Sequence, residues 1–234
     1  MATQIHHFSP DNFRDICDAL AASDTDLTAI INAHGYPPMW NRPNTFETLI
    51  HIILEQQVSL ASALAALNKL REKLGSPITP EGLLLLTDEE LKACYFSRQK
   101  SAYTRHLARA LQSRELDLAA LESLPDHEVR TRLTALKGIG DWTVDVYLIF
   151  VLQRADIFPL GDLAAVNALK RIKKIPKDTG RDQLLTMISN WQPHRTIATM
   201  LLWHFYLSAP RTSPRTAPPT STRAAPRKSP RKKR

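Results

Sequence analysis

The chain has 234 residues, of which 43% are hydrophobic and 23% are charged. This is enough apolar material for a sizeable core, so folding requires no disulfide or structural metal. The two cysteines, Cys17 and Cys94, lack Cys-x-x-Cys spacing, which excludes a disulfide framework and a four-cysteine zinc or iron–sulfur site. We therefore expect a soluble globular protein from a reducing, intracellular compartment.

The formal net charge of +8 is unevenly distributed along the chain. Residues 210–234 hold nine of the 31 basic residues and no acidic residue, which leaves residues 1–209 with 22 basic and 23 acidic side chains. The terminal segment also lacks large apolar residues that could offset the entropy of ordering. The sequence thus predicts a folded domain over residues 1–209 and a disordered basic tail over 210–234. Such a tail could bind phosphates, serve as an import-like patch, or only aid solubility.

Membrane signals are absent from the sequence pattern. The start, MATQIHHFSPDNF, has no cationic and apolar signal-peptide pattern, and the longest apolar runs, residues 83–86 and 146–152, are too short to span a bilayer. We expect no membrane association.

Helix signals recur in chain order, whereas alternating strand patterns are missing, so the domain is predicted to be all-α. Helix starts are predicted at Ser9-Pro10, at Thr79-Pro80, at a capping box from Thr87 to Glu90, and at Ser97, which opens an amphipathic stretch through Leu111. Further helices are predicted over residues 46–57, 60–74, 126–136, 142–152, 163–172, 183–191 and 195–207. No repeat of 20 to 50 residues is present, which argues against a solenoid.

Two closely spaced glycines, Gly138 and Gly140, stand between two helical patterns. Glycine allows positive φ and close backbone approach, so this turn could direct the first amides of the following helix at an anion such as a DNA phosphate. By itself the pattern is weak evidence for such a site, because it is more often a plain helix–helix turn.

The longer segment from residue 136 to 162, LKGIGDWTVDVYLIFVLQRADIFPLGD, closely resembles the helix-hairpin-helix (HhH-GPD) DNA glycosylase superfamily, in its 3-methyladenine DNA glycosylase II branch. The resemblance extends to residues 46–49, 53–59 and 203, and leaves only the tail outside. It implies two helical lobes with an active-site cleft between them. It also implies a phosphate-binding hairpin formed by Lys137, Gly138, Ile139, Gly140 and Thr143.

In the same resemblance, Asp162 occupies the position of the catalytic acid. The residue also precedes the helix predicted over 163–172 and could act only as its N-cap. Both roles need a fixed carboxylate. At about 4 Å from a sugar that gains positive charge, such a carboxylate contributes about 4 kcal/mol at an effective dielectric constant of about 20. This corresponds to roughly a thousandfold in rate.

The resemblance places Trp142 and Trp203 in the base pocket, although each could equally belong to the core. Indole faces favour a cationic ring by about 0.5 to 2 kcal/mol, which suits alkylated purines. Lyase-competent relatives carry a lysine at the position of Trp142, so its absence favours a monofunctional enzyme.

Extrusion of a base leaves a gap in the stack, and the resemblance assigns the residue that fills it, the wedge, to Gln57, with Gln56 beside it. A helix-terminal glutamine pair in solvent is the alternative. Tyr95 stands where the family more usually has a glycine-containing element, which suggests an altered turn near DNA. His6, His7, His194 and His204 are expected to have no metal-binding or catalytic role.

Taken together, the resemblance implies a DNA glycosylase that excises 3-methyladenine- and 7-methylguanine-type bases by hydrolysis. Its expected partner is double-stranded DNA containing damaged bases. No cofactor or metal is required, although a monovalent cation could bridge hairpin carbonyls and a phosphate. We expect a DNA-associated intracellular monomer, in the nucleoid or in a nucleus. The alternatives are a non-catalytic DNA-binding module and a bifunctional glycosylase/lyase.

Overall fold

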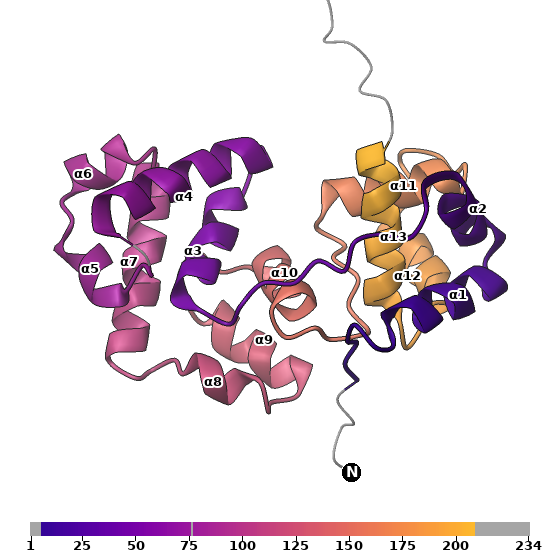
Figure 1. The fold of residues 1–234 in the computed structure, drawn as a ribbon, viewed down its shortest axis with the longest axis horizontal. Coiled ribbons are helices and arrows are strands. Elements are labelled where there is room, and N and C mark those ends of the chain that lie inside the picture. The colour runs from indigo at the N-terminus through magenta and orange to yellow at the C-terminus, as the bar shows by residue number, and fades with distance from the viewer. Residues whose placement is uncertain (1–5, 76, 209–234) are drawn as a thin grey trace, which may run out of the picture.

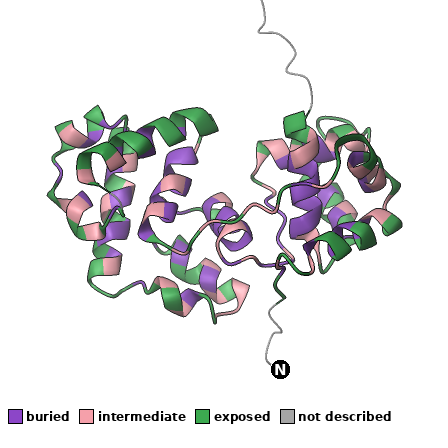
Figure 2. Cartoon of the chain, viewed as in Figure 1, coloured by how far each residue is buried: buried purple, intermediate pink, exposed green. Residues whose placement is uncertain are grey.

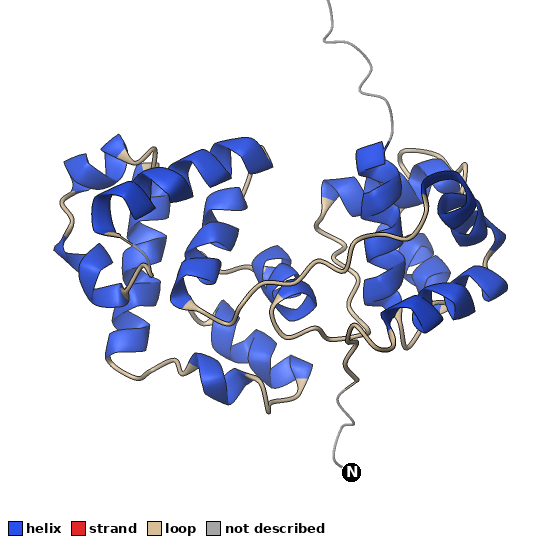
Figure 3. Cartoon of the chain, in the orientation of Figure 1, coloured by secondary structure: helices blue, strands red, loops and turns tan. Residues whose placement is uncertain are grey.

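The computed structural model describes residues 6–75 and 77–208, so the predicted basic tail lies outside the described residues. These residues form thirteen α-helices and one isolated bridge between His7 and Arg154 (Figure 3). The helices are α1 (Phe13–Ser23), α2 (Thr25–His34), α3 (Phe46–Glu55), α4 (Leu60–Leu74), α5 (Pro80–Leu85), α6 (Asp88–Ala93), α7 (Arg98–Gln112), α8 (Leu118–Leu121), α9 (Asp126–Thr134), α10 (Asp141–Phe150), α11 (Leu163–Ile172), α12 (Arg181–Ser189) and α13 (Arg195–Ser208). The all-α prediction is confirmed.

Side-chain caps fix most of the helix starts that the sequence predicted. Thr79 accepts a hydrogen bond from the Gly82 amide at the start of α5, and Thr87 forms the predicted capping box with Glu90 at α6. The Ser97 hydroxyl accepts a hydrogen bond from the Lys100 amide at the start of α7. Local hydrogen bonding therefore determines these boundaries, which is why they can be found in the sequence.

Other boundaries differ from the prediction. The helix expected at Ser9-Pro10 begins only at Phe13, because Asn12 Oδ1 accepts the Ser9 amide and the intervening residues form a turn. Helix α3 ends at Glu55 rather than at residue 57, since Gln56 already leaves the helical conformation with a ψ of 122° and Gln57 follows with a positive φ of 58°. Helices α2 and α8 were not predicted, and both are capped by aspartates, Asp24 and Asp117.

The helices are arranged in two lobes, as the resemblance implied (Figure 1). One lobe contains α3 to α10, in which α3 packs against α4, α7 and α10. In the other lobe, α13 packs against α1, α2 and α11. The chain passes between the lobes twice, once between α2 and α3 and once between α10 and α11 (Figure 1). The second crossing ends at Asp162.

Helices α10 and α13 are largely buried and lie at the centre of the molecule and of the second lobe, respectively (Figure 2). In α10 every residue from Thr143 to Ile149 is buried, and in α13 every residue from Thr196 to Trp203. Burial on all sides leaves these helices little freedom to move, so they provide rigid supports for a site. Among the described helices, none combines the length and apolar character required to cross a bilayer.

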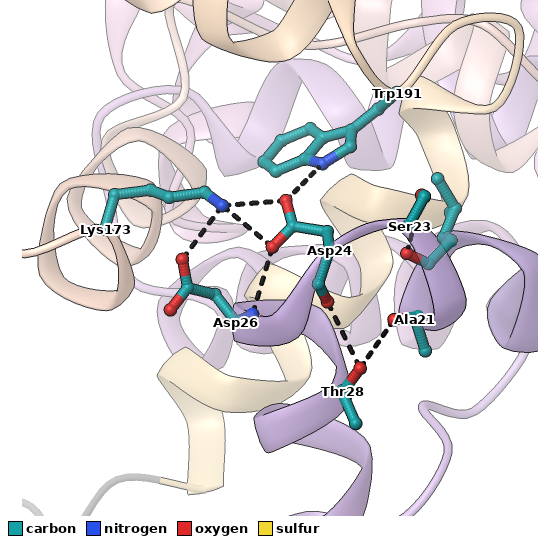
Figure 4. Close-up of polar contacts among 8 residues, drawn as sticks. Ala21, Ser23, Asp24, Asp26, Thr28, Lys173 and Trp191 are labelled. Carbon is teal, nitrogen blue, oxygen red and sulfur yellow. Dashed lines mark hydrogen bonds and ion pairs between the residues drawn. The ribbon is translucent and has the colours of Figure 1, made fainter.

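A polar cluster joins the start of α2 to the end of α11 (Figure 4). Lys173 Nζ lies 2.8 and 2.7 Å from the two carboxylate oxygens of Asp24, and Trp191 Nε1 donates to the same carboxylate at 2.8 Å. Asp26 adds a second ion pair with Lys173 at 2.9 Å. Burial alone would raise the pKa of Asp24, but the hydrogen bonds from Lys173 and Trp191 outweigh it and lower that pKa.

Candidate active site and nucleic-acid interface

Asp162 ends the segment that connects α10 to α11, and its side chain caps α11. Its Oδ1 accepts hydrogen bonds from the Ala165 amide at 2.8 Å and from Trp203 Nε1 at 3.0 Å. Its Oδ2 accepts from Trp142 Nε1 at 2.9 Å. Three N–H groups from three helices therefore fix both oxygens, and the adjacent helix N-terminus favours a negative charge there.

Trp142 and Trp203 thus meet at Asp162, although they stand 61 positions apart in the sequence. Trp203 is only 9% exposed, and one face of its ring stacks on Phe150 at 5.3 Å between centroids. Trp142 is half-buried and therefore more exposed than Trp203. Both indoles orient Asp162, and Trp142 is the one with accessible surface for a ligand.

Two further aromatic residues, which the sequence did not predict, pack against Trp203 and form an aromatic wall with it. Phe150 ends α10, and Trp40 from the crossing segment packs edge-on to Trp203 at 6.5 Å. The Arg42 guanidinium lies 5.1 Å from the centre of the Phe150 ring and forms a two-point ion pair with Glu55 at 2.9 and 2.7 Å. Nothing in the local pattern of residues 36–45 indicates this placement, because it depends on how the segment crosses between the lobes.

The glycine hairpin joins α9 to α10. Gly138 has a φ of 93°, and a Cβ at this position would lie 2.0 Å from Cγ of Tyr103 in α7. Gly140 is the N-cap of α10 and supplies no side-chain cap, so the first amides of that helix lack a side-chain partner within the described chain. Lys137 is exposed beside them, whereas Ile139 is buried. The hairpin therefore presents an uncapped helix N-terminus, which is a suitable binding site for an anion.

Gln56 and Gln57 differ in their environment. Gln56 Nε2 donates to the Gly138 carbonyl and to Thr143 Oγ1, both at 2.9 Å, and so ties α3 to the hairpin. Gln57 is exposed and left-handed, with a φ of 58°. Of the pair, Gln57 is the residue whose side chain is available for an external contact.

The hydrogen bonds of Gln56 involve two groups of the predicted hairpin, the Thr143 hydroxyl and the Gly138 carbonyl. Thr143 is buried and directs its hydroxyl at Gln56 rather than outward. Among the hairpin carbonyls, that of Gly138 accepts a hydrogen bond from the Gln56 side-chain amide. Within residues 6–75 and 77–208, no group of three or more His, Cys, Asp or Glu side chains has a metal-binding arrangement.

Tyr95 lies in the turn before α7. It has a φ of 65° and is 65% exposed, so a non-glycine residue occupies a left-handed position there. His204 Nε2 lies 2.9 Å from the His34 carbonyl, and burial lowers the pKa of His194. Neither histidine hydrogen-bonds to Asp162.

A helical fold with an uncapped glycine hairpin and a capping aspartate held by two indoles defines a helix-hairpin-helix protein with a carboxylate site. Residues 50–193 match the family model described as the HhH-GPD superfamily base excision DNA repair protein. The chain belongs to this superfamily. The matched segment includes Gln57, the hairpin and Asp162.

Similar proteins and solved structures agree with this assignment. A DNA-3-methyladenine glycosylase 1 from Schizosaccharomyces pombe is 33% identical over 161 residues, which cover 68% of this chain and 71% of that protein. The structure of a S. pombe 3-methyladenine DNA glycosylase in complex with abasic DNA is 29% identical, with a TM-score of 0.75 over 81% of this chain and 95% of that one. A DNA-3-methyladenine glycosidase structure from Bacillus halodurans is 29% identical, with a TM-score of 0.71 over 88% and 94%. The chain spans 66% of the length of a further curated relative, from Bacillus subtilis.

Proposed function

We propose that this protein is a monofunctional DNA glycosylase that excises alkylated purines, of the 3-methyladenine and 7-methylguanine type, by hydrolysis of the N-glycosidic bond. The observation that carries the proposal is the Asp162 carboxylate, held by two indole N–H groups and one helix amide at 2.8 to 3.0 Å. The names of the similar proteins support the substrate class.

Asp162 acts on the sugar. When the bond between the base and C1′ breaks, the base leaves with the bonding electrons and positive charge builds on the sugar. A carboxylate about 4 Å away stabilises this charge by about 4 kcal/mol. Because both oxygens are already oriented by N–H donors, little reorganisation is needed during the reaction. The same carboxylate orients the water that adds to C1′ and takes up its proton.

The alkylated base requires little assistance to leave. Alkylation at N3 or N7 gives the purine a positive charge, so it departs as a neutral molecule without a general acid. The accessible indole of Trp142, together with the wall formed by Trp203, Phe150 and Trp40, provides electron-rich surface for such a ring. Trp203 serves mainly to support this wall, since one of its faces is covered by Phe150.

Binding of the duplex is assigned to the hairpin and the end of α3. The free amides of Gly140 and the first turn of α10, with Lys137 beside them, bind a backbone phosphate. Gln57 inserts into the gap left by the extruded base, and Gln56 holds the hairpin at a fixed position relative to this wedge. The protein acts as a DNA-associated monomer on double-stranded DNA that contains damaged bases.

Strand cleavage is not part of the proposed activity. A lyase needs an amine that attacks C1′, and Trp142 stands at the position where lyase-competent relatives of the superfamily carry their lysine. Its indole nitrogen is hydrogen-bonded to Asp162 and cannot serve as a nucleophile.

Substitution of Asp162 tests this proposal. We expect Asp162→Asn to lower the single-turnover release of N3-methyladenine from methylated duplex DNA by about a thousandfold, because the charge that stabilises the sugar cation is lost. Binding of the damaged duplex should persist. Strand breaks should appear only after alkali treatment of the wild-type reaction.

Asp117→Asn is the matched control, since Asp117 caps α8 through the amides of Ala119 and Ala120 and lies outside the site. It should excise at the wild-type rate. Retention of near-normal excision by Asp162→Asn would remove Asp162 from the catalytic role. Tight DNA binding without any release by the wild type would point to a non-catalytic DNA reader, and breaks before alkali would point to a lyase.

A further inference from the structure

Helix α7 exposes a basic stripe that the proposed site does not use. Arg98, Arg105 and Arg109 are spaced by seven and four residues and therefore lie on one face of the helix, whose opposite face is buried. His106 lies next to them. With Lys137 and Asp88, these residues line a pocket of about 330 Å³ between α7 and the hairpin.

The charges in this pocket are only partly balanced. Arg105 is held in place, since it donates to Asp88 at 2.5 Å and to the Leu86 carbonyl at 2.6 Å. Arg98, Arg109 and Lys137 are exposed and have no ion pair or side-chain hydrogen bond with any residue that the structure describes. The pocket thus combines one neutralised arginine with three available cations, an arrangement that attracts a polyanion.

The pocket is continuous with the hairpin. Lys137 belongs to both, because it lines the pocket and directly precedes Gly138. Helix α7 and the hairpin are also packed together, with the Tyr103 ring against the Gly138 backbone so closely that no Cβ would fit between them. The stripe therefore has a fixed position relative to the uncapped N-terminus of α10.

We propose that this pocket, built by Arg98, Arg109 and Lys137, is a second phosphate site that binds a phosphodiester group of duplex DNA beyond the one bound by the hairpin amides. The inference rests on the proposed DNA glycosylase function. Duplex DNA presents a phosphate about every 3.4 Å along each strand, so a strand that is bound at the hairpin carries further phosphates past the adjoining stripe. Arginine at such a site sets affinity and register, and it contributes no base preference.

The test is the salt dependence of binding to an undamaged duplex, measured by fluorescence anisotropy. A plot of log K against log salt has a negative slope, and each lost phosphate contact reduces the magnitude of that slope by about 0.9. Because the site binds one phosphodiester group, we expect the double variant Arg98→Gln/Arg109→Gln to reduce the magnitude of the slope by about 0.9 and to weaken binding roughly three- to tenfold at moderate salt. Its single-turnover excision rate at saturating enzyme should remain that of the wild type.

Two controls separate a defined site from a general loss of charge. Lys177→Gln removes an exposed cation from the other lobe and should leave the slope unchanged. A duplex with one neutral methylphosphonate linkage, moved along the strand, should weaken wild-type binding both at the hairpin position and at a second position. In the double variant the sensitivity should disappear at the second position only.

An unchanged slope in a folded double variant would overturn the proposal. An equal decrease with Lys177→Gln, or a loss of methylphosphonate sensitivity at every position, would also overturn it. Because the binding measurement uses undamaged DNA, a wild-type protein that binds but excises nothing would refute the proposed function while leaving the phosphate site supported. If the double variant keeps the wild-type slope while the wild-type protein excises normally, the phosphate site alone would be refuted.

Discussion

At the scale of single residues, Gln56 and Gln57 differ in what their side chains contact. Gln56 and Gln57 are adjacent and chemically identical, yet the amide of the first is bonded to the hairpin and the side chain of the second is exposed. The backbone differs as well, because Gln56 has a ψ of 122° at the end of α3 and Gln57 has a positive φ of 58°. Side-chain chemistry alone could not separate the two roles.

Gln57→Ala tests the wedge at this scale. Removal of the side chain should lower excision from paired duplex about tenfold, because nothing then fills the gap in the base stack, and should change excision from single strands little. Excision of one methylated base from both substrates measures the effect. Gln56→Ala should instead lower the free energy of unfolding by about 1 to 2 kcal/mol, because two hydrogen bonds are lost. A Gln57→Ala variant that is impaired equally on both substrates would rule out the wedge.

At the scale of elements, the α9–α10 hairpin depends on a contact from outside itself. The two glycines look equivalent in the sequence, but only Gly138 combines a positive φ with the approach of an aromatic ring. Gly140 has open space around its Cβ position and serves as the N-cap of α10. Arg130 of α9 further fixes α10 through an ion pair with Asp145 at 2.6 Å.

Gly138→Ala should therefore destabilise the protein by about 2 kcal/mol or more, since both the backbone conformation and the Tyr103 ring oppose a Cβ. Gly140→Ala should cost less than about 1 kcal/mol. Urea unfolding of both variants measures the difference. Equal free energies of unfolding would mean that the hairpin can shift away from Tyr103.

At the scale of the whole molecule, the two lobes each assemble residues that are far apart in the chain. The second lobe combines α1 and α2 with α11–α13, although the whole of the first lobe lies between them in the sequence. The cluster of Asp24, Lys173 and Trp191 connects these two parts of the chain (Figure 4). The cluster holds the end of α11, whose first turn is capped by Asp162. The ion pair and the Asp162 carboxylate therefore lie at opposite ends of one helix.

Lys173→Met should lower the free energy of unfolding by about 2 to 3 kcal/mol near neutral pH, because it leaves two carboxylates without their cation. Hydrogen bonds from Lys173 and Trp191 outweigh burial and lower the pKa of Asp24, so the stabilisation is present above about pH 4 and is lost as the pH falls through the folded-state pKa. The difference between variant and wild type in urea unfolding should accordingly shrink below about pH 4. A difference independent of pH would assign the effect to packing.

Much of the candidate site could be predicted because it is encoded locally. The hairpin glycines, the capping position of Asp162 and the starts of α5, α6 and α7 each depend on a few consecutive residues, whose hydrogen bonds form within one turn. The boundaries of α4 and α11 were predicted to the residue for the same reason. The catalytic role proposed for Asp162 nevertheless came from the family resemblance, since a capping aspartate is also an ordinary structural feature.

The sequence by itself determined the helical class, the hairpin and the capping aspartate, because hydrophobic periodicity and capping act over a few residues. Only the tertiary structure decided that Trp142 and Trp203 both donate to Asp162 and that Trp40 and Phe150 complete the aromatic wall. It also decided that Gln56 holds the hairpin and that the stripe on α7 adjoins it. These contacts join segments separated by dozens of residues, and they form only once the helices pack, so no local pattern records them.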